Sequence, residues 1–128
     1  MQEFIHYFLH LVFPFFIAWI FFRKDWKKAY LTMLATMLVD LDHFLADPIF
    51  QANRCSVGFH PFHSFYIIPL YFLLILFPKP FRWIGIGLSL HMLTDLNDCM
   101  FMYTQCPSCQ EGAPAYEILH RIAEILRI

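Results

Sequence analysis

The chain has 128 residues, of which 59% are hydrophobic and 20% aromatic, and its formal net charge is −1. This composition excludes an ordinary small soluble domain, because one core of this size would leave many of its 16 Phe side chains in water. Lipid could cover those side chains, and the length allows one compact domain. The chain has no basic patch with interleaved aromatic residues, so nucleic acid is not an expected partner.

Four apolar segments are expected to form transmembrane helices, and they occupy residues 4–22, 29–45, 62–77 and 83–103. A spanning helix needs about 20 mostly apolar residues. The second and third segments are shorter, so we expect them to tilt or to thin the bilayer locally. The residues before the first segment carry no base, unlike the start of a secretory signal, so we expect this segment to remain in the mature protein.

The positive charges of the connections predict the orientation of these helices. The first and third connections carry most of them, namely Arg23, Lys24, Lys27, Lys28, Lys79 and Arg82. The second connection, residues 46–61, has only Arg54. Because Lys and Arg near membrane ends stay in the cytoplasm, the N-terminus, the second connection and the tail are expected to face outward. The predicted fold class is therefore an all-α, polytopic membrane protein with four helices in an up-down bundle.

The last 25 residues differ from the rest of the chain. A Cys-containing loop is followed by a stretch from residue 115 to 128 with apolar residues at helical spacing, namely Ile118, Leu119, Ile122, Ile125 and Leu126. This pattern predicts an amphipathic helix on the membrane surface or across the bundle. The expected organisation is thus a transmembrane domain over 1–103 with a buried metal site, and a loop with an amphipathic helix over 104–128.

All four cysteines, Cys55, Cys99, Cys106 and Cys109, fall on the expected outer side, where an oxidising compartment permits disulfides. A single Cys-x-x-Cys pair without a second pair is weak support for a zinc knuckle. A structural disulfide is favoured over a redox-active pair. It would join Cys106 to Cys109 or include Cys55.

The ionisable residues inside the apolar segments all lie toward the outward ends of those segments. In the fourth segment, His91, Asp95 and Asp98 fall on one face of a helix, at a spacing that suits a divalent metal. A buried His–Asp hydrogen bond that fixes helix packing is the other reading of this pattern. Ionisable groups in hydrocarbon are costly and normally pair with one another or with an ion, so a metal site is the first hypothesis.

The second segment contributes Asp40 and His43 on one face, whereas Asp42 points about 160° away in an unbroken α-helix. The helix is therefore expected to unwind near Asp42, or Asp42 caps another element. His60 and His63 lie where the outer connection enters the third segment. They are close enough in sequence to bind one metal ion together. The alternative is that both imidazoles lie at the membrane interface among lipid headgroups.

His6 and His10 share a face of the first helix, as ligands or as hydrogen-bond donors to ligands. The expected metal ligands from all four segments are His10, Asp40, Asp42, His43, His60, His63, His91 and Asp95. This set exceeds the four ligands of one zinc ion, so a site for one or two divalent ions is predicted. Mixed imidazole and carboxylate ligands favour zinc among those ions.

The order Asp40-Leu-Asp42-His43, then His60-x-x-His63-Ser64, then His91-x-x-x-Asp95 resembles the bacterial inner-membrane family of LexA-binding, membrane-bound, metal-dependent hydrolases. A more distant likeness links the order of these ligands to zinc-dependent phospholipase C. The first resemblance covers about residues 5–100 and implies that Asp42, His63, His91 and Asp95 are the leading ligands. It also implies a multi-pass protein of the bacterial inner membrane with its site on the periplasmic side. This chain departs from that family at Pro61, where the family has Arg.

Three functions remain open from the sequence. The first is a metal-dependent hydrolase acting on a lipid or lipid-linked phosphoester, with Asp40 or Asp98 as the catalytic base and membrane lipid as the partner. The second is a non-catalytic subunit, stapled by metal, of a larger membrane complex. The third is a metal or proton carrier, which is disfavoured because the cytoplasmic halves of the helices lack ionisable residues.

Overall fold

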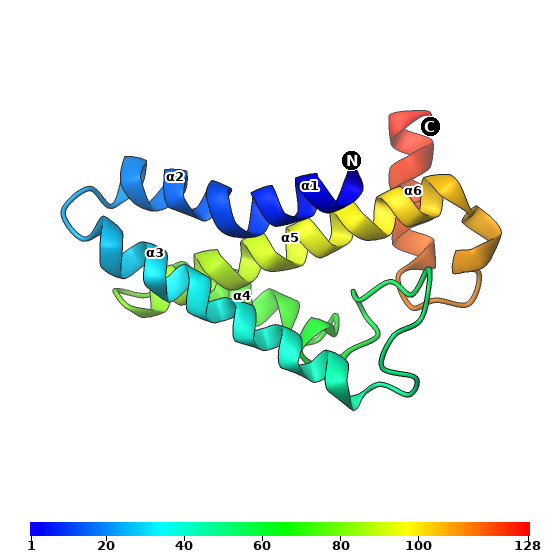
Figure 1. The fold of residues 1–128 in the computed structure, drawn as a ribbon, viewed down its shortest axis with the longest axis horizontal. Helices are drawn as coiled ribbons and strands as arrows, with labels where there is room; N and C mark the ends of the chain where they lie inside the picture. The colour runs from blue at the N-terminus through cyan, green and yellow to red at the C-terminus, as the bar shows by residue number, and fades with distance from the viewer.

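A computed structural model describes all 128 residues and contains helices and loops but no strand, as the all-α prediction requires. Long helical stretches run side by side, and a final short helix lies across one end (Figure 1). The elements are α1 (Gln2–Tyr7), η1 (Phe8–Val12), α2 (Phe13–Phe21), α3 (Trp26–Ala35), η2 (Thr36–Leu45), η3 (Pro61–His63), α4 (Ile68–Leu74), α5 (Phe81–Gln105), η4 (Pro107–Gln110) and α6 (Tyr116–Leu126).

The first expected helix is continuous, but its middle turn, η1, is a π-helix. Pro14 explains this change, because it has no N–H and its ring would clash with the carbonyl of His10 in a regular α-helix. A wider π turn removes that clash, and single π turns occur often at functional sites. His10 lies in this turn and is buried.

The second expected helix changes type halfway. α3 is α-helical to Ala35, and η2 then continues as a 3-10 helix to Leu45. Thr36 begins this change, since its hydroxyl donates a hydrogen bond of 2.5 Å to the carbonyl of Met33 and so competes with the α-helical backbone pattern. The second segment is therefore helical throughout, but more tightly wound at the end that carries the acids.

The third expected helix is shorter than residues 62–77. α4 contains only seven residues and begins next to Pro69, which is tolerated in a first turn but not in a helix interior. The residues before it form the short 3-10 helix η3 and turns. This shortening leaves His63 on an irregular backbone that can approach η2.

α5 is the central helix, and two glycines bring its neighbours close to it. A Cβ at Gly85 would lie 2.7 Å from the backbone nitrogen of Ile75, and a Cβ at Gly87 would lie 3.0 Å from the Cα of Met33. α4 and α3 therefore contact the backbone of α5 at these positions.

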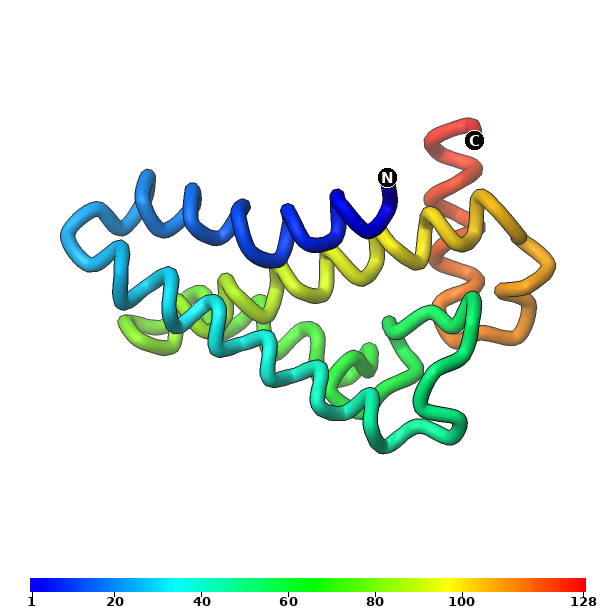
Figure 2. Tube along the Cα trace, in the orientation of Figure 1, coloured from blue at the N-terminus to red at the C-terminus, as the bar shows by residue number.

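The apolar core has two separate clusters, with the polar site between them along the bundle. The first cluster, Ala18, Ala29, Met33 and Trp83, joins α2, α3 and α5 near the connections at 22–25 and 78–80. The second cluster contains Cys55, Val57, Cys99, Tyr103, Ala115, Leu119 and Ala123, so α6 packs on α5 and on the second connection (Figure 2). The tail thus contributes to the core at the far end.

Two disulfides lie at that far end. Cys55 is bonded to Cys99 on α5, and Cys106 is bonded to Cys109 across η4. The Cys106–Cys109 bond is one of the pairings expected from the sequence. The other bond fastens the second connection to α5.

One helical stretch, Gln2–Phe21, is long and apolar enough to cross a bilayer, and its place near the N-terminus is also typical of a signal sequence. None of the other three expected spans forms a helix that is both long enough and apolar enough to cross a bilayer. α4 is too short, and α5 carries the polar residues of the site.

Candidate metal centre

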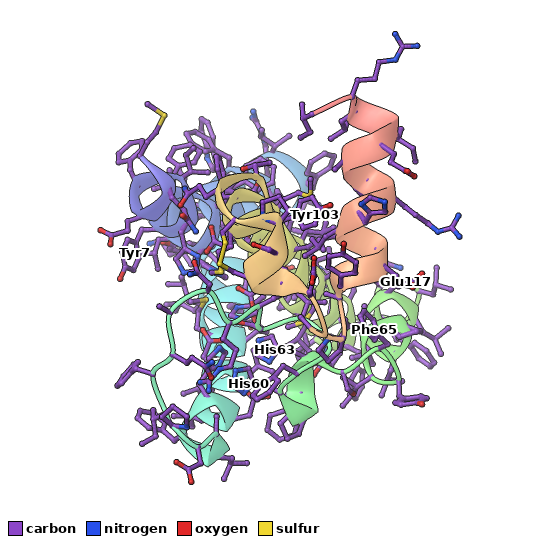
Figure 3. All side chains as sticks on the ribbon, turned by 90° about the vertical axis from the view of Figure 1, so that its right-hand side faces the viewer. Tyr7, His60, His63, Phe65, Tyr103 and Glu117 are labelled. Carbon is purple, nitrogen blue, oxygen red and sulfur yellow. A yellow bond between two sulfur atoms is a disulfide. The ribbon has the colours of Figure 1, made fainter.

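Four segments deliver ionisable side chains to one place in the bundle. α5 supplies His91, Asp95 and Asp98, and η2 supplies Asp40, Asp42 and His43. The end of the second connection supplies His60 and His63, and the first helix supplies His6 and His10. His60 and His63 lie beside each other in the end view of the molecule (Figure 3). Segments far apart in the sequence therefore build one polar cluster.

The 3-10 winding of η2 turns Asp42 toward this cluster. At about three residues per turn, Asp42 lies about 120° from Asp40, compared with about 160° in an α-helix. Asp42 is fully buried and accepts a hydrogen bond of 2.7 Å from the backbone N–H of Phe62. The helix does not unwind near Asp42, contrary to one of the two expectations; it is wound more tightly, and this allows Asp40, Asp42 and His43 to contact the third segment together.

The tautomer of His63 follows from its contact with Asp42. The Nδ1 atom of His63 lies 3.0 Å from Oδ2 of Asp42, so a neutral His63 donates from Nδ1 to the carboxylate. Its Nε2 atom then carries a lone pair. A carboxylate that orients a histidine in this way is the usual partner of a metal-binding imidazole.

The Nε2 atom of His63 faces three other ligand atoms. Its Nε2 atom lies 3.3 Å from Nε2 of His91, 3.4 Å from Oδ1 of Asp40 and 3.0 Å from Oδ2 of Asp95. His91 Nε2 lies 3.0 Å from Asp40 Oδ1 and 3.6 Å from Asp95 Oδ2. All four residues offer atoms within 4.8 Å of one another.

These separations match a tetrahedral metal site. Zinc ligands at about 2.0 Å from the ion in a tetrahedron lie about 3.3 Å from one another. Five of the six ligand pairs lie between 3.0 and 3.6 Å. Two carboxylates and two imidazoles therefore surround a space that a divalent cation fits, and we call Asp40, His63, His91 and Asp95 the first ligand group.

A second ligand group consists of His6, His10 and Asp95. His10 Nε2 lies 3.7 Å from Oδ1 of Asp95, which leaves Oδ2 of the same carboxylate to the first group. The buried Nε2 of His10 and Oδ1 of Asp98 have no hydrogen-bond partner in the protein, and the other oxygen of Asp98 bonds to His6. Partnerless buried polar atoms are costly, and a cation bridged to the first group through Asp95 would satisfy His10.

A third ligand group consists of Asp42, His43 and His60. The rings of His43 and His60 contact each other with centroids 3.9 Å apart and planes tilted by 32°. Burial, followed by the proximity of His43, lowers the pKa of His60 to about 4, so this imidazole is neutral at neutral pH. All eight ligands expected from the sequence thus belong to one of the three groups.

A cavity of about 350 Å³ opens beside the first and second groups. Polar side chains on its wall include His6, Asp40, His43, Ser56, Asp95 and Asp98. Apolar side chains on its wall include Phe44, Ile49, Phe50 and Met102. Asp40 is the most exposed of the first group, with 39% of its side chain accessible, so this group is reached from the cavity.

Two residues of this region were not among the eight expected ligands. His6 joins the second group, and its four-residue spacing from His10 was the signal for it. Ser56 lines the cavity from the second connection, and no pattern in the sequence marks it. His120 lies away from the site and bonds to the hydroxyl of Tyr103.

The structure therefore contains a buried cluster of histidines and aspartates that can bind a metal. No curated protein and no solved structure matches the chain. A family model does match, over residues 1–102, and it covers the first three helical segments, most of α5 and every member of the three ligand groups. The chain belongs to this family, which is described as a family of unknown function, DUF6122.

Proposed function

We propose that this protein is an integral-membrane, metal-dependent hydrolase that acts on a lipid or lipid-linked phosphoester. The observation that carries the proposal is the near-tetrahedral first ligand group beside a cavity with both polar and apolar walls. Hydrolysis of a phosphoester needs a cation near the phosphoryl oxygens and room for the substrate. An apolar wall formed by Phe44, Ile49 and Phe50 suits the hydrocarbon part of a lipid.

The surface supports a membrane location, because large apolar side chains lie outside and ionisable ones inside. The first helix exposes Phe4, Tyr7, Leu11, Phe16, Trp19, Ile20 and Phe21, and the other segments expose Leu31, Leu38, Leu41, Phe44, Leu70, Phe72, Leu73 and Leu76. Water would oppose such a surface, whereas lipid accepts it. The histidines and aspartates of the ligand groups are, by contrast, mostly buried inside the bundle, as expected for ionisable groups in a membrane.

We further propose four passes, with α4 and its flanking turns as the shortest one. The connections that carry Arg23, Lys24 and Lys79 lie together at one end of the bundle (Figure 2), with Arg82 beside them in the first turn of α5, and the ligand groups lie further along that helix. The positive-inside tendency would place the basic end in the cytoplasm. The N-terminus and the site would then face the periplasm of a bacterial inner membrane.

The ligand groups favour zinc and two ions. Two imidazoles and two carboxylates at tetrahedral separations suit zinc, and His6, His10 and the shared Asp95 would hold a second ion. Such ions lower the pKa of water and polarise a phosphoryl oxygen when bound. Asp98 faces the same cavity and has an oxygen without a partner, so we assign it to accept the proton of an attacking water.

The experiment that tests this proposal measures metal content and hydrolysis in the same purified samples. Wild-type protein in detergent should contain one or two zinc ions per chain by elemental analysis and should hydrolyse a long-chain phosphoester. His63→Ala should lose both properties while circular dichroism shows that it remains helical. His120→Ala, outside the three ligand groups, serves as the control and should retain both.

A second function is favoured by one feature, the four protein ligands of the first group. Structural zinc sites are closed by four protein ligands, whereas catalytic ones keep one position open. A non-catalytic subunit stapled by metal within a larger membrane complex would therefore also use this group. If His63→Ala loses metal and unfolds, and no wild-type hydrolysis is found across phosphomonoester and phosphodiester lipids, the second function replaces the first.

A further inference from the structure

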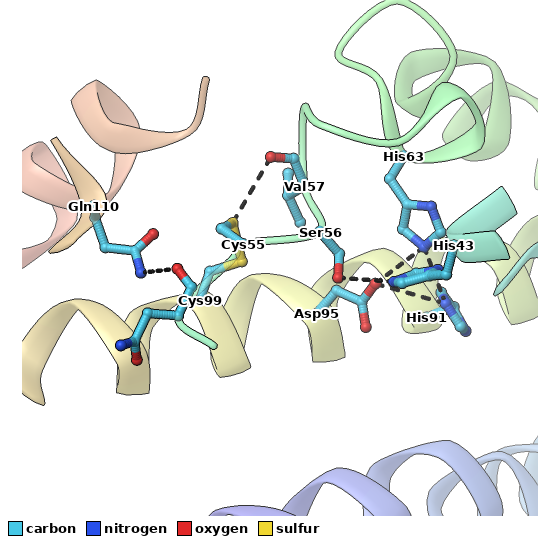
Figure 4. The surroundings of a disulfide bond; sticks show 10 residues. His43, Cys55, Ser56, Val57, His63, His91, Asp95, Cys99 and Gln110 are labelled. Carbon is cyan, nitrogen blue, oxygen red and sulfur yellow. Dashed lines mark hydrogen bonds and ion pairs between the residues drawn. A yellow bond between two sulfur atoms is a disulfide. The ribbon is translucent and has the colours of Figure 1, made fainter. Parts of the chain in front are cut away.

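Ser56, His43 and Asp42 form a hydrogen-bonded chain on the cavity side of the metal centre. Ser56 Oγ lies 3.1 Å from Nε2 of His43, and Nδ1 of the same ring lies 3.2 Å from Oδ1 of Asp42. Figure 4 shows the contact between Ser56 and His43 beside the disulfide that holds this connection. A hydroxyl, an imidazole and a carboxylate in this order are the parts of an activated serine nucleophile.

The contacts of His43 fix the direction of these hydrogen bonds. Its Nδ1 atom also lies 3.2 Å from the backbone carbonyl of Asp40, which can only accept. Two acceptors at Nδ1 require that a neutral ring carries its proton there. Nε2 then accepts from the hydroxyl of Ser56, which is the polarity that removes a proton from a serine.

Three neighbouring contacts hold Ser56, His43 and Asp42 in place. Cys55, next to Ser56, is buried and bonded to Cys99 of α5, so the second connection is fastened to the central helix. The ring of His60 packs against that of His43 at a tilt. Asp42 is fixed by the backbone N–H of Phe62. Such support is what a catalytic serine needs, because a displaced nucleophile loses most of its rate.

Ser56, His43 and Asp42 have the exposure pattern of a catalytic triad. Ser56 and His43 both line the cavity of about 350 Å³, whereas Asp42 is fully buried behind them. The same cavity contains Asp40 and Asp95 of the first ligand group and the apolar side chains of Phe44 and Phe50. A phosphoester with its hydrocarbon part on the apolar wall would meet Ser56 and the metal centre in one space.

We propose that Ser56 is the covalent nucleophile of this site, with His43 as its base and Asp42 as the residue that orients His43. The proposal rests on the proposed function for its cavity and substrate class, and it replaces direct attack by water with two steps. His43 here carries a hydrogen-bonded proton at Nδ1 and serves Ser56, so it does not bind a cation.

In the first step the Ser56 oxygen attacks phosphorus while its proton passes to Nε2 of His43. The bond from phosphorus to the leaving alcohol breaks, and the alcohol takes the proton from His43. In the second step water attacks the phosphoserine and gives a proton to His43. The bond from phosphorus to the Ser56 oxygen breaks, and His43 returns the proton to Ser56. The sum is one water consumed, with phosphate or a phosphomonoester and an alcohol as products.

The test uses a long-chain alkyl fluorophosphonate, whose phosphorus reacts with an activated serine as fluoride leaves. Intact full-length protein in detergent should gain one adduct mass, and peptide mass spectrometry should place it on Ser56. Ser56→Ala should not be labelled, and His43→Gln should be labelled about 100-fold more slowly, the usual contribution of a general base. Ser108→Ala, on the exposed η4 turn, is the matched serine control and should label like wild type.

Each outcome bears on one proposal separately. An adduct on another residue, or unchanged labelling of Ser56→Ala, contradicts the proposal that Ser56 is the nucleophile. Should Ser56→Ala fail to fold, the adduct position in wild type still decides. If wild type binds zinc and hydrolyses the lipid without any labelling, the covalent step fails and the proposed function remains. If Ser56 is labelled in protein that contains no metal and binds none, the nucleophile remains and the metal-dependent function fails.

Discussion

The two ends of the bundle are built on opposite principles. At the basic end, around the connections at 22–25 and 78–80, small residues and a tryptophan pack into an apolar cluster and the charges are exposed. Toward the other end, which we call the site end, three ligand groups of histidines and aspartates lie in the bundle, and two disulfides lie beyond them. The basic end is held mainly by apolar packing, whereas the site end adds polar contacts and covalent bonds to its own apolar cluster.

This difference shows where the protein depends on something besides its own chain. At the basic end Gly85 and Gly87 allow the helices to touch, and one buried polar atom, Nε1 of Trp83, has no partner. The site end leaves polar atoms of His10, His91 and Asp98 without partners. Because buried polar atoms without partners are costly, we expect the site end alone to respond when a bound cation is removed.

Metal removal is the largest expected effect. Treatment with a strong chelator should speed backbone amide exchange by about ten-thousandfold or more in η2 and around His91, because bound zinc stabilises only the native state and structural zinc binding is worth on the order of 10 kcal/mol. Amides of α3 and of the first turns of α5 should keep their rates. Hydrogen–deuterium exchange with mass spectrometry measures both regions in one sample, and added zinc should restore the first. Equal change at both ends would contradict the contrast between them.

Loss of the Cys55–Cys99 disulfide should come next. The bond spans a sequence separation of 44, so the chain-entropy relation gives about 4 kcal/mol of stabilisation for this bond. The Cys106–Cys109 bond spans only three residues, and the same relation gives about 2 kcal/mol. Thermal unfolding in detergent of the two paired Cys→Ser variants should therefore show the larger loss for Cys55 and Cys99. The reverse order would mean that the second connection is held by other contacts.

A smaller effect is expected at the basic end for Gly85→Ala. The new Cβ would lie 2.7 Å from the backbone nitrogen of Ile75, and overpacking of this kind costs about 1–3 kcal/mol. Metal content should be unchanged, because the ligand groups lie further along α5. Ser89→Ala is the control in the same helix, since its buried hydroxyl has no partner to lose. Thermal unfolding and elemental analysis check the two parts, and loss of metal in Gly85→Ala would show that the ends are coupled.

The smallest effect should come from the ion pair of the basic end. Lys79 Nζ lies 2.5 Å from Oδ2 of Asp25 and lowers the pKa of that exposed carboxyl. A lowered folded-state pKa gives stability that is present above pH 3.8, the unfolded value, and is lost as the pH falls through the folded value. Asp25→Asn should lower the unfolding temperature only slightly, and salt should remove the difference. A large fall in unfolding temperature that salt does not change would contradict this, because it would mean that the ion pair is shielded from solvent.

Much of the site could be predicted before the fold was known. The spacing of His91, Asp95 and Asp98 places them on one helix face, and the position of the other acids and imidazoles at alternate ends of successive apolar segments predicts that they meet at one end of an up-down bundle. The tertiary structure added the order within the cluster. Only the 3-10 winding of η2 decides that Asp42 orients His63, and only the π turn at Pro14 buries His10.

The sequence by itself determined that the protein is helical, largely apolar outside and polar at one end, because periodicity and composition are local properties. It could not determine the length of α4, the partner of Cys55 or the contact of Ser56 with His43. Each of these depends on how close two distant segments come. That distance is set by packing at a few positions such as Gly85 and by the change of helix type in η2, which no periodic pattern records.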